Sequence, residues 1–446
     1  MSKAGPLFSK KELLSLALPL LLEQLLTMMM GTVDTLMVSS VGEAAVSGIS
    51  LVESLDILVL QILAALATSG TVIVSQYLGR QDRQHARQAS GQLYTVTLAL
   101  GLILSAAVCT TAVPMLRLIF GAIDRNVMSC SQIYFSVVGL SYPAIGMYYA
   151  GTALFRAQGN SKIGLYSSLA VNLINVGGNA LMIYGLRLGV LGAAIATLTA
   201  RSAGAAYMVK CQKENSELSV SAFSDLRPDR YIISKIVRIA FPSSLENGIF
   251  HIGKILVSSV VAGLGTSAIA AFAVANSLTG LSVSPGLAMS TAMIPVVGRC
   301  LGAGDKVQAR HFAMVLQGTA MGILLLCYLL LWVLLPGLLP LYRLSETAAS
   351  LCVRSCHVFA LSAAPFWAFS FVLPGAMRAG GDVKFTMAVS IVSMFLCRVL
   401  LAAVFVRTAS LGLIGVWLGM AADFIFRTAF FIPRFFSGRW IHDDVI

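Results

Sequence analysis

Apolar positions follow one another in long runs along this chain, and short segments between the runs hold most of the charged residues. The uncharged runs from residue 88 to 116, from 163 to 186 and from 312 to 342 each exceed the roughly 20 residues that a helix needs to cross a bilayer. None shows the alternation of apolar and polar positions that is typical of a transmembrane barrel strand. The pattern predicts an all-α integral membrane protein.

The runs and their charged breaks predict about twelve transmembrane helices, with ends placed to within roughly 2–4 residues. The expected spans are 13–38, 48–78, 89–113, 131–153, 163–185, 189–209, 238–262, 271–298, 312–335, 355–376, 385–406 and 411–433.

Composition supports the membrane assignment. Of the 446 residues 57% are hydrophobic and only 11% are charged, and the mean hydropathy is +0.85, well outside the usual range of soluble domains. The first span is too long for the apolar core of a signal peptide and no small-residue cleavage site closes it, so we expect the N-terminus to stay attached.

The distribution of Lys and Arg predicts the orientation, because basic residues near helix ends are retained in the cytoplasm. With the N-terminus inside, the inner segments hold 21 of the 31 Lys and Arg residues and the outer segments hold six. We therefore expect a multi-pass protein of the plasma membrane with both termini cytoplasmic. The net charge of +12 follows from these loops, so nucleic acid is not an expected partner.

Short motifs of the first half recur in the second half at a nearly constant offset. LALP followed by Glu23 matches IAFP followed by Glu246, and this pair sets the offset. The other three matches are YLGRQDRQHAR from Tyr77 with CLGAGDKVQAR from Cys300, FRAQGNSK from Phe155 with MRAGGDVK from Met377, and LGVLGAA from Leu188 with LGLIGVW from Leu411.

Each repeat holds about six helices, and an even number makes the two repeats parallel about an axis along the membrane normal. We expect an N-terminal lobe over residues 1–210, a cytoplasmic linker over 211–230 and a C-terminal lobe over 231–446. Two such lobes around a central cavity that opens alternately to each side are the architecture of a secondary transporter. No Walker-type nucleotide motif is present, and no enzyme activity is expected.

Polar residues inside the spans are candidates for function, because a charge near the bilayer centre costs about 2.5–3.5 kcal/mol on insertion scales. On the first helix, Glu23 and Asp34 are eleven residues apart, which places them on one face. Glu23 follows Pro19 and serves either helix packing or function. Asp34 has no basic neighbour in its own span, which favours a functional role over a purely structural one.

The fifth span carries Asn172, Asn175 and Asn179 at helical spacing. This stripe suits cation coordination by amide oxygens, and interhelical hydrogen bonding explains it equally well. On the second helix, Glu53 is explained about as well by solvation near the helix end as by function.

The seventh span carries Glu246 and then Asn247, His251 and Lys254 on one face. Pairing of Lys254 with a carboxylate on another helix is expected, as a static ion pair or as a switch. In the last two spans, a satisfied structural network of Arg398, Asp423 and Arg427 is expected.

Together, LALP, GTVDTLMVSSVG around Asp34, YLGRQD, FRAQGNSK and LGVLGAAIAT resemble the multidrug and toxic compound extrusion (MATE) transporters. Because of the repeat, the resemblance covers about the whole chain. It implies two six-helix lobes and export of small cationic or amphipathic compounds in exchange for H⁺ or Na⁺. It also links the aspartate that matches Asp34 to cation coupling.

One motif departs from the family pattern. Many members carry a second aspartate before a proline in the fifth helix, where this chain reads NVGGNA with Asn179 and Ala180. An amide cannot take up a proton in the working pH range, although its oxygen can bind Na⁺. The coupling ion, H⁺ or Na⁺, is therefore left open by the sequence.

The alternative functions are a flippase and an integral membrane enzyme. A flippase for a lipid-linked saccharide shares the two-lobe plan but is expected to have more basic residues in its cavity. A membrane enzyme would need clustered acidic residues or a His and Cys metal set, and neither spacing occurs. We expect no catalytic residues, no metal, no cofactor besides the coupling ion, and a functional monomer within the lipid bilayer.

Overall fold

The computed structural model describes residues 6–121, 124–215, 218, 227–407, 411–442 and 445–446. These residues are helical almost throughout, which confirms the all-α prediction, and within them the only β-type pairing is an isolated bridge between Gly381 and Ile441. They divide into two compact units. We call Lys10–Ser244 the N-terminal unit, and Leu245–Ile446 together with the first residues up to Ser9 the C-terminal unit.

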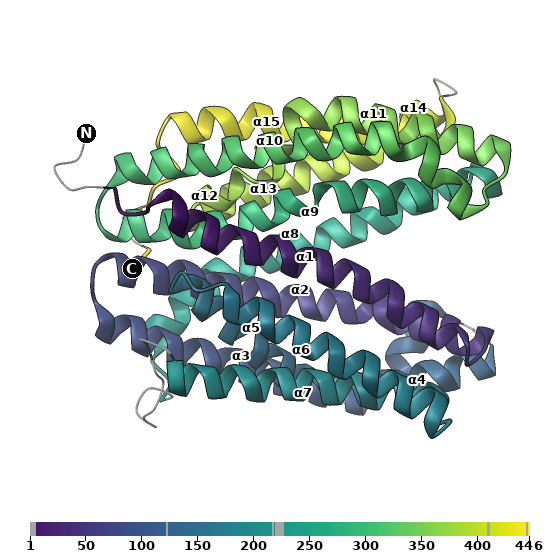
Figure 1. The fold of residues 1–446 in the computed structure, drawn as a ribbon, viewed down its shortest axis with the longest axis horizontal. Coiled ribbons are helices and arrows are strands. Elements are labelled where there is room, and N and C mark those ends of the chain that lie inside the picture. Colours follow the sequence, from purple (N-terminus) through teal and green to yellow (C-terminus); the bar gives the residue numbers. More distant parts are fainter. Residues whose placement is uncertain (1–5, 122–123, 216–217, 219–226, 408–410, 443–444) are drawn as a thin grey trace. The chain divides into compact units, whose positions relative to one another are not determined.

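The described residues of the N-terminal unit form helices joined by short turns (Figure 1). Long helices form because each run offers about 20 or more predominantly apolar residues and satisfies its own backbone hydrogen bonds, as a segment in lipid must. Its elements are α1 Lys10–Ser39, α2 Glu43–Gly79, α3 Arg83–Phe120, α4 Arg125–Gly139, α5 Tyr142–Ala157, α6 Lys162–Asn179, the π-helix η1 Ala180–Gly185 and α7 Gly189–Asn215, followed by the start of α8 Arg230–Ala262.

The C-terminal unit takes the rest of α8 and a second set of helices. Its elements are α9 Thr266–Gly302, α10 Lys306–Leu338, the short η3 Leu339–Tyr342, α11 Glu346–Phe371, α12 Pro374–Ala379, α13 Val383–Ser393, the π-helix η4 Met394–Leu401, α14 Ala402–Arg407 and α15 Gly412–Phe436.

Each of the twelve predicted spans lies on one helix or on a run of consecutive helices. Eight of the described helices are long and apolar enough to cross a membrane. The predicted span 131–153 was wrong in one respect, because it is broken between α4 and α5 at Leu140 and Ser141. Pro143 lies in the first turn of α5, where its missing N–H costs no intrahelical hydrogen bond, and this starts a new helix within an apolar run.

In the N-terminal unit, α2 packs against α3, α4 and α5, and α6 lies between α1 and α7 (Figure 1). The helices α3 and α5 approach closely at Gly101, where a Cβ atom would lie 2.7 Å from the Cα atom of Pro143. The core around α2 contains fully buried aliphatic and aromatic side chains, among them Val52, Leu63 and Phe135. This packing fixes α2 as the centre of the unit.

In the C-terminal unit, α9 packs against α10, α11 and α12, and α11 lies along α15. Aromatic rings fill this core. Phe359 makes edge contacts with Trp417 and Phe424, and Phe371 makes a further edge contact with Phe424. Edge-to-face aromatic pairs of this kind stabilise by roughly 0.5–1.5 kcal/mol beyond their buried area.

The repeat seen in the sequence is visible in matching local structures. The turn before α3 has Gln81 at φ 61°, and the turn before α10 has Gly304, at the matching position of the second repeat, at φ 76°. Asp82 and Asp305 then cap the two helices by accepting backbone N–H groups. In addition, a π-helix follows α6 in one unit and α13 in the other.

Candidate functional site

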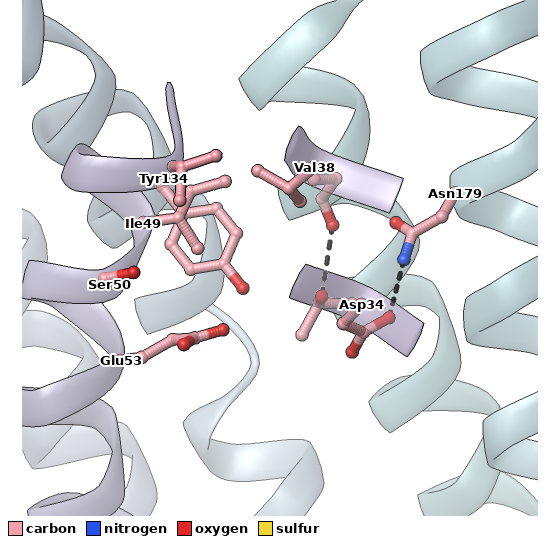
Figure 2. A pocket seen from close by; sticks show the side chains of 10 residues that line it. Asp34, Val38, Ile49, Ser50, Glu53, Tyr134 and Asn179 are labelled. Atoms are coloured by element: carbon pink, nitrogen blue, oxygen red, sulfur yellow. Dashed lines mark hydrogen bonds between the residues drawn. The ribbon is translucent and has the colours of Figure 1, made fainter. Parts of the chain in front are cut away.

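A pocket inside the N-terminal unit gathers several of the polar residues singled out above. It contains about 350 Å³ of space not filled by atoms, part of it open to solvent, and α1, α2, α4, α6 and α7 supply its walls. Residues far apart in the chain therefore meet in it (Figure 2). The lining residues are Asp34, Val38, Val46, Ile49, Ser50, Glu53, Tyr134, Asn179, Ala193 and Thr197.

Asp34 is half-buried in this pocket, near the C-terminal end of α1. Asn179 donates from Nδ2 to Asp34 Oδ1 at 2.8 Å (Figure 2). With its amide nitrogen turned toward the carboxylate, Asn175 donates to Oδ1 at 2.6 Å and to Oδ2 at 3.2 Å. Among the described residues no Lys or Arg forms an ion pair with Asp34, so neutral donors hold this carboxylate.

The asparagine stripe of α6 is only partly used at the pocket. Asn175 and Asn179 are four residues apart and so lie one turn from each other on the face toward Asp34. Asn172 does not line the pocket, and its Nδ2 is buried without a hydrogen-bond partner among the described residues. Asn179 Oδ1 is likewise buried and accepts no hydrogen bond within that part of the chain.

A change of helix type begins directly after Asn179. The α-helical hydrogen-bond pattern of α6 ends there, and the chain continues directly into the π-helix η1. π-Helical segments are rare and are often found at functional sites, because the wider turn re-aims side chains and loosens backbone hydrogen bonding. Here the transition lies beside the amide that contacts Asp34.

Glu53 lies across the pocket from Asp34. Its carboxylate points into the open space, next to the hydroxyl of Tyr134 (Figure 2). Among the described residues Glu53 has neither a hydrogen bond nor an ion pair. Two carboxylates facing one pocket produce a negative potential that attracts cations. The pocket therefore explains Glu53 better than solvation at a helix end does.

An ion pair that no sequence pattern predicted borders this pocket. Arg201, on α7, donates to both carboxylate oxygens of Asp56, on α2, and also to Ser141 Oγ at 3.0 Å. Asp56 follows Glu53 by three residues and Arg201 follows Thr197 by four, so each lies one turn from a pocket residue. This spacing could have indicated that Asp56 and Arg201 lie near the pocket. Their pairing with each other could not be predicted, because it depends on the tertiary packing of α2 and α7.

Glu23 and Glu246 occupy matching places in the two repeats. Arg156 donates to Glu23 Oε1 at 2.7 Å, and Arg378 donates to Glu246 Oε1 at 2.9 Å. Both arginines come from the repeated motif FRAQGNSK and MRAGGDVK. Neither glutamate lines the pocket. The two pairs each join the first helix of a repeat to the segment before its fifth predicted span.

The remaining candidates of the seventh predicted span lie in the C-terminal unit. Asn247 and His251 are half-buried and Lys254 is exposed on α8. Lys254 was expected to pair with a carboxylate, and this was wrong among the described residues. Its Nζ instead lies 5.4 Å from the ring centroid of Phe250, one turn earlier on the same helix.

The predicted network of Arg398, Asp423 and Arg427 forms, but it is not fully satisfied. Asp423 accepts a hydrogen bond from Arg427 Nε at 2.8 Å and also from Ser393. Arg398 Nε lies 3.4 Å from Asp423 Oδ2 without the geometry of a hydrogen bond. Within the described residues, no cluster of three or more His, Cys, Asp or Glu side chains could hold a metal ion.

Comparison with known proteins identifies the family. The MatE family model matches residues 19–181 and again residues 242–404. This chain belongs to the MatE family. The two matches have equal length and begin at Pro19 and Pro242, the prolines of LALP and IAFP, which confirms the internal repeat. Together they cover more than half of the chain. Members of this family are transporters and not enzymes.

Curated MatE relatives extend over almost the whole chain. A probable multidrug resistance protein NorM of Thermotoga maritima is 27% identical over 443 residues, covering 97% of this chain and 93% of the relative. The multidrug export protein MepA of Staphylococcus saprophyticus is 20% identical over 417 residues, covering 93% and 91%. These names do not favour the alternative of a saccharide flippase.

Solved structures confirm the MatE fold. One is an outward-facing conformation of a multidrug resistance MATE family transporter, with a TM-score of 0.87, 21% identity and coverage of 96% of this chain and 95% of the other. Another is a transporter of the same superfamily from Pyrococcus furiosus, whose binding pocket is described as reversed in polarity. Its TM-score is 0.85 and its identity 22%, with coverage of 96% of this chain and 95% of the other.

Proposed function

We propose that this chain is a secondary active multidrug exporter that expels cationic or amphipathic compounds in exchange for incoming H⁺ or Na⁺. Membership of the MatE family and the names of the relatives support export of small molecules. The single observation that supports coupling of export to a cation is the pocket that holds Asp34 and Glu53 inside the N-terminal unit.

Asp34 is the residue that binds the coupling cation. A half-buried carboxylate held only by amide donors retains its negative charge without a fixed counter-charge, at an energetic cost in a low-dielectric region. A proton or a sodium ion that neutralises it removes this cost. Binding and release of the cation therefore change the free energy of the pocket, and alternating access couples that change to movement of the substrate.

The other pocket residues favour cation binding in different ways. Glu53 adds a second negative charge. The free Asn179 Oδ1 is an oxygen ligand of the type that hard cations prefer, and Asn175 orients the carboxylate. This set accommodates Na⁺ through its oxygens and H⁺ through its carboxylates. Asn172 contributes by packing within α6.

The proposal also covers the arrangement in the cell. The excess of Lys and Arg in alternate loops supports cytoplasmic termini and residence in the plasma membrane. We expect the lobes to extend over residues 1–210 and 231–446 with a linker over 211–230, part of which lies outside the described residues. Each unit has its own buried core, and this supports a functional monomer.

Transport by the purified full chain in liposomes tests the proposal. A fluorescent cationic dye is followed while inward gradients of H⁺ and Na⁺ are imposed separately, which tests transport and ion together. We expect efflux that depends on one of the two gradients and that Asp34→Asn abolishes. Glu43→Gln is the matched control, because Glu43 is an exposed carboxylate at the start of α2 outside the pocket.

Two results would contradict the proposal. Dye efflux that depends on neither gradient would show that the protein is not an antiporter for H⁺ or Na⁺. Gradient-driven efflux by Asp34→Asn at the rate of Glu43→Gln removes Asp34 from the coupling site. A thermal unfolding midpoint for Asp34→Asn equal to that of the control shows that a lost activity is not a lost fold.

A further inference from the structure

Arg201 lies beside the pocket of the N-terminal unit but pairs with neither of the carboxylates that line it. Its guanidinium donates to Asp56 Oδ1 at 3.2 Å, to Asp56 Oδ2 at 2.6 Å and to Ser141 Oγ at 3.0 Å. The side chains of Arg201 and Asp56 are only 13% and 10% exposed, so little water screens their charges. A guanidinium has five N–H donors, and these three hydrogen bonds leave two of them available.

Glu53 is a second acceptor for this arginine. Glu53 and Asp56 are three residues apart on α2, so they lie one turn from each other with Cβ atoms about 5–6 Å apart. Arg201 follows Thr197 by four residues on α7, and Thr197 lines the pocket together with Glu53. The carboxylate of Glu53 points into the pocket and, among the described residues, has no ion pair (Figure 2). One arginine is therefore placed near two carboxylates of the same helix.

The charges around the pocket give such an exchange a purpose. Without a bound cation, Asp34 and Glu53 are two negative charges in a region of low dielectric constant, which is energetically costly. Arg201 is the positive member of the set of titratable groups at the pocket and the ion pair. That set consists of Asp34 on α1, Glu53 and Asp56 on α2, Tyr134 on α4, Tyr142 and Tyr149 on α5, and Arg201 on α7.

The repeat separates this ion pair from those that the common architecture uses. The pair of Glu23 and Arg156 recurs in the second repeat, whereas the pair of Asp56 and Arg201 does not. At the offset that carries Glu23 onto Glu246, Glu53, Asp56 and Arg201 correspond to Asn276, Thr279 and Phe424.

The second repeat therefore packs these positions without charge. Thr279 and Phe424 are 4% and 0% exposed, so uncharged side chains fill the corresponding places in the C-terminal unit. Replacing a buried ion pair by well-packed uncharged residues is often neutral or stabilising. The charges of Asp56 and Arg201 thus belong to the pocket of the N-terminal unit and not to the architecture of a repeat.

We propose that Arg201 is an internal counter-ion that changes its partner during the transport cycle. It pairs with Asp56 while the coupling cation occupies the pocket, and it moves to Glu53 when the cation leaves. Arg201 then competes with the cation for Glu53 and so promotes its release, because a cation that binds only to one of the two pairings shifts their populations. This role rests on the proposed cation-coupled export and adds a step to it.

A neutral double variant, Arg201→Gln with Asp56→Asn, tests the proposal. Dye efflux from liposomes that contain the full chain is measured over a range of concentrations of the driving cation and normalised to folded protein. Without its internal competitor the cation should bind more tightly and leave more slowly. We expect the half-maximal cation concentration to fall about fivefold or more, and the maximal rate to fall as well.

Asp56→Asn alone should have the opposite effect on cation affinity. Arg201 then keeps its charge but loses the carboxylate of Asp56, so it stays on Glu53. The half-maximal cation concentration should rise about fivefold or more. A general loss of stability does not shift cation affinity in opposite directions in two variants that share a substitution.

The double variant Glu23→Gln with Arg156→Gln is the matched control. It also removes both charges of a part-buried ion pair in the N-terminal unit, but neither residue lines the pocket. Its half-maximal cation concentration should equal that of the unchanged protein.

Several results would overturn the proposal. An unchanged half-maximal concentration in the neutral double variant would leave the pair with a structural role, as would an equal shift in the control. A shift of Asp56→Asn in the same direction as the double variant contradicts competition by Arg201. If Asp56→Asn does not fold although Glu23→Gln does, Glu53 is not a partner for Arg201.

The same measurements separate this inference from the proposed function. Gradient-driven efflux by the unchanged protein, with no shift in either variant, leaves cation-coupled export intact and removes only the role of Arg201. Absence of gradient-dependent efflux in the unchanged protein overturns both.

Discussion

Arg201 holds the carboxylate of Asp56 through two hydrogen bonds, from Nη1 to Oδ1 at 3.2 Å and from Nη2 to Oδ2 at 2.6 Å. This fork geometry is the strongest form of an ion pair between an arginine and a carboxylate. It neutralises Asp56 and joins α2 to α7 beside the pocket. Asp34 and Glu53 are then the pocket carboxylates without an ion pair among the described residues.

Breaking this pair should destabilise the protein strongly. Arg201→Gln leaves Asp56 as an uncompensated charge that is 7% exposed, and removing one partner of a buried pair typically costs about 3–5 kcal/mol. We expect a clear fall in the apparent thermal unfolding midpoint of the purified protein in detergent. The combined variant Arg201→Gln and Asp56→Asn should recover much of the loss, because no charge is then left unpaired.

A matched comparison separates this ion pair from a general effect of the substitution. Arg125→Gln, at the exposed start of α4, removes an arginine without breaking a buried pair and should leave the midpoint unchanged. Equal midpoints for Arg201→Gln and Arg125→Gln would show that the pair with Asp56 adds nothing to stability.

The repeated pairs Glu23–Arg156 and Glu246–Arg378 should behave differently from Asp34. Glu23→Gln and Glu246→Gln each remove the negative charge of the acceptor in a buried hydrogen bond from arginine, at a cost of about 1.5–3 kcal/mol. Both variants should unfold at lower temperature, while the protein that remains folded exports dye at an unchanged rate. Asp34→Asn should show the reverse, with lost export and an unchanged unfolding midpoint.

The measurement combines thermal unfolding with efflux normalised to folded protein. The double variant Glu23→Gln and Arg156→Gln is the control, since it removes both members of the pair and should be less destabilised than Glu23→Gln alone. Loss of efflux at full stability in Glu23→Gln would move this residue from a structural role into the transport mechanism.

Much of the fold could be predicted from the sequence because the bilayer constrains each helix within its own stretch of chain. A helix in lipid must satisfy its own backbone and be apolar over about 20 residues, so each span is visible in its own stretch of chain. The repeat was visible for a similar reason, since Glu23 and Glu246 retain their motifs. The break at Leu140 and Ser141 was not visible, because no charged residue interrupts the run there and only Pro143 indicates a new helix.

The candidate site was accessible only in part. Asp34, Asn175 and Asn179 were found from spacing, and the structure brings them together. The partners of the charges were not predictable, because Arg201 and Asp56 are 145 residues apart and join different helices. The same limit explains the wrong expectation for Lys254. Its surroundings depend on η4 and α15, whose packing no local pattern encodes.

The cap at the start of α3 should make a stability contribution that depends on pH. Asp82 accepts the backbone N–H of His85 at 3.1 Å and also contacts the His85 ring, with Oδ2 2.6 Å from Nδ1. The backbone hydrogen bond from His85 is the main cause that lowers the pKa of Asp82, and the ring hydrogen bond adds to it. Removing such a cap typically costs about 0.5–2 kcal/mol.

The direction of this pH dependence follows from the lowered pKa of Asp82. The folded protein holds the Asp82 proton less tightly than the unfolded chain, so the contribution is fully present above the unfolded pKa of about 3.9 and is lost as the pH falls through the lower folded value. Asp82→Ala should therefore reduce the unfolding midpoint at pH values above about 5, with the difference disappearing well below pH 4. Asp305→Ala, which removes the corresponding cap of α10, should reduce the midpoint likewise. A difference between Asp82→Ala and the unchanged protein that persists undiminished in acid would show that the carboxylate charge does not support this cap.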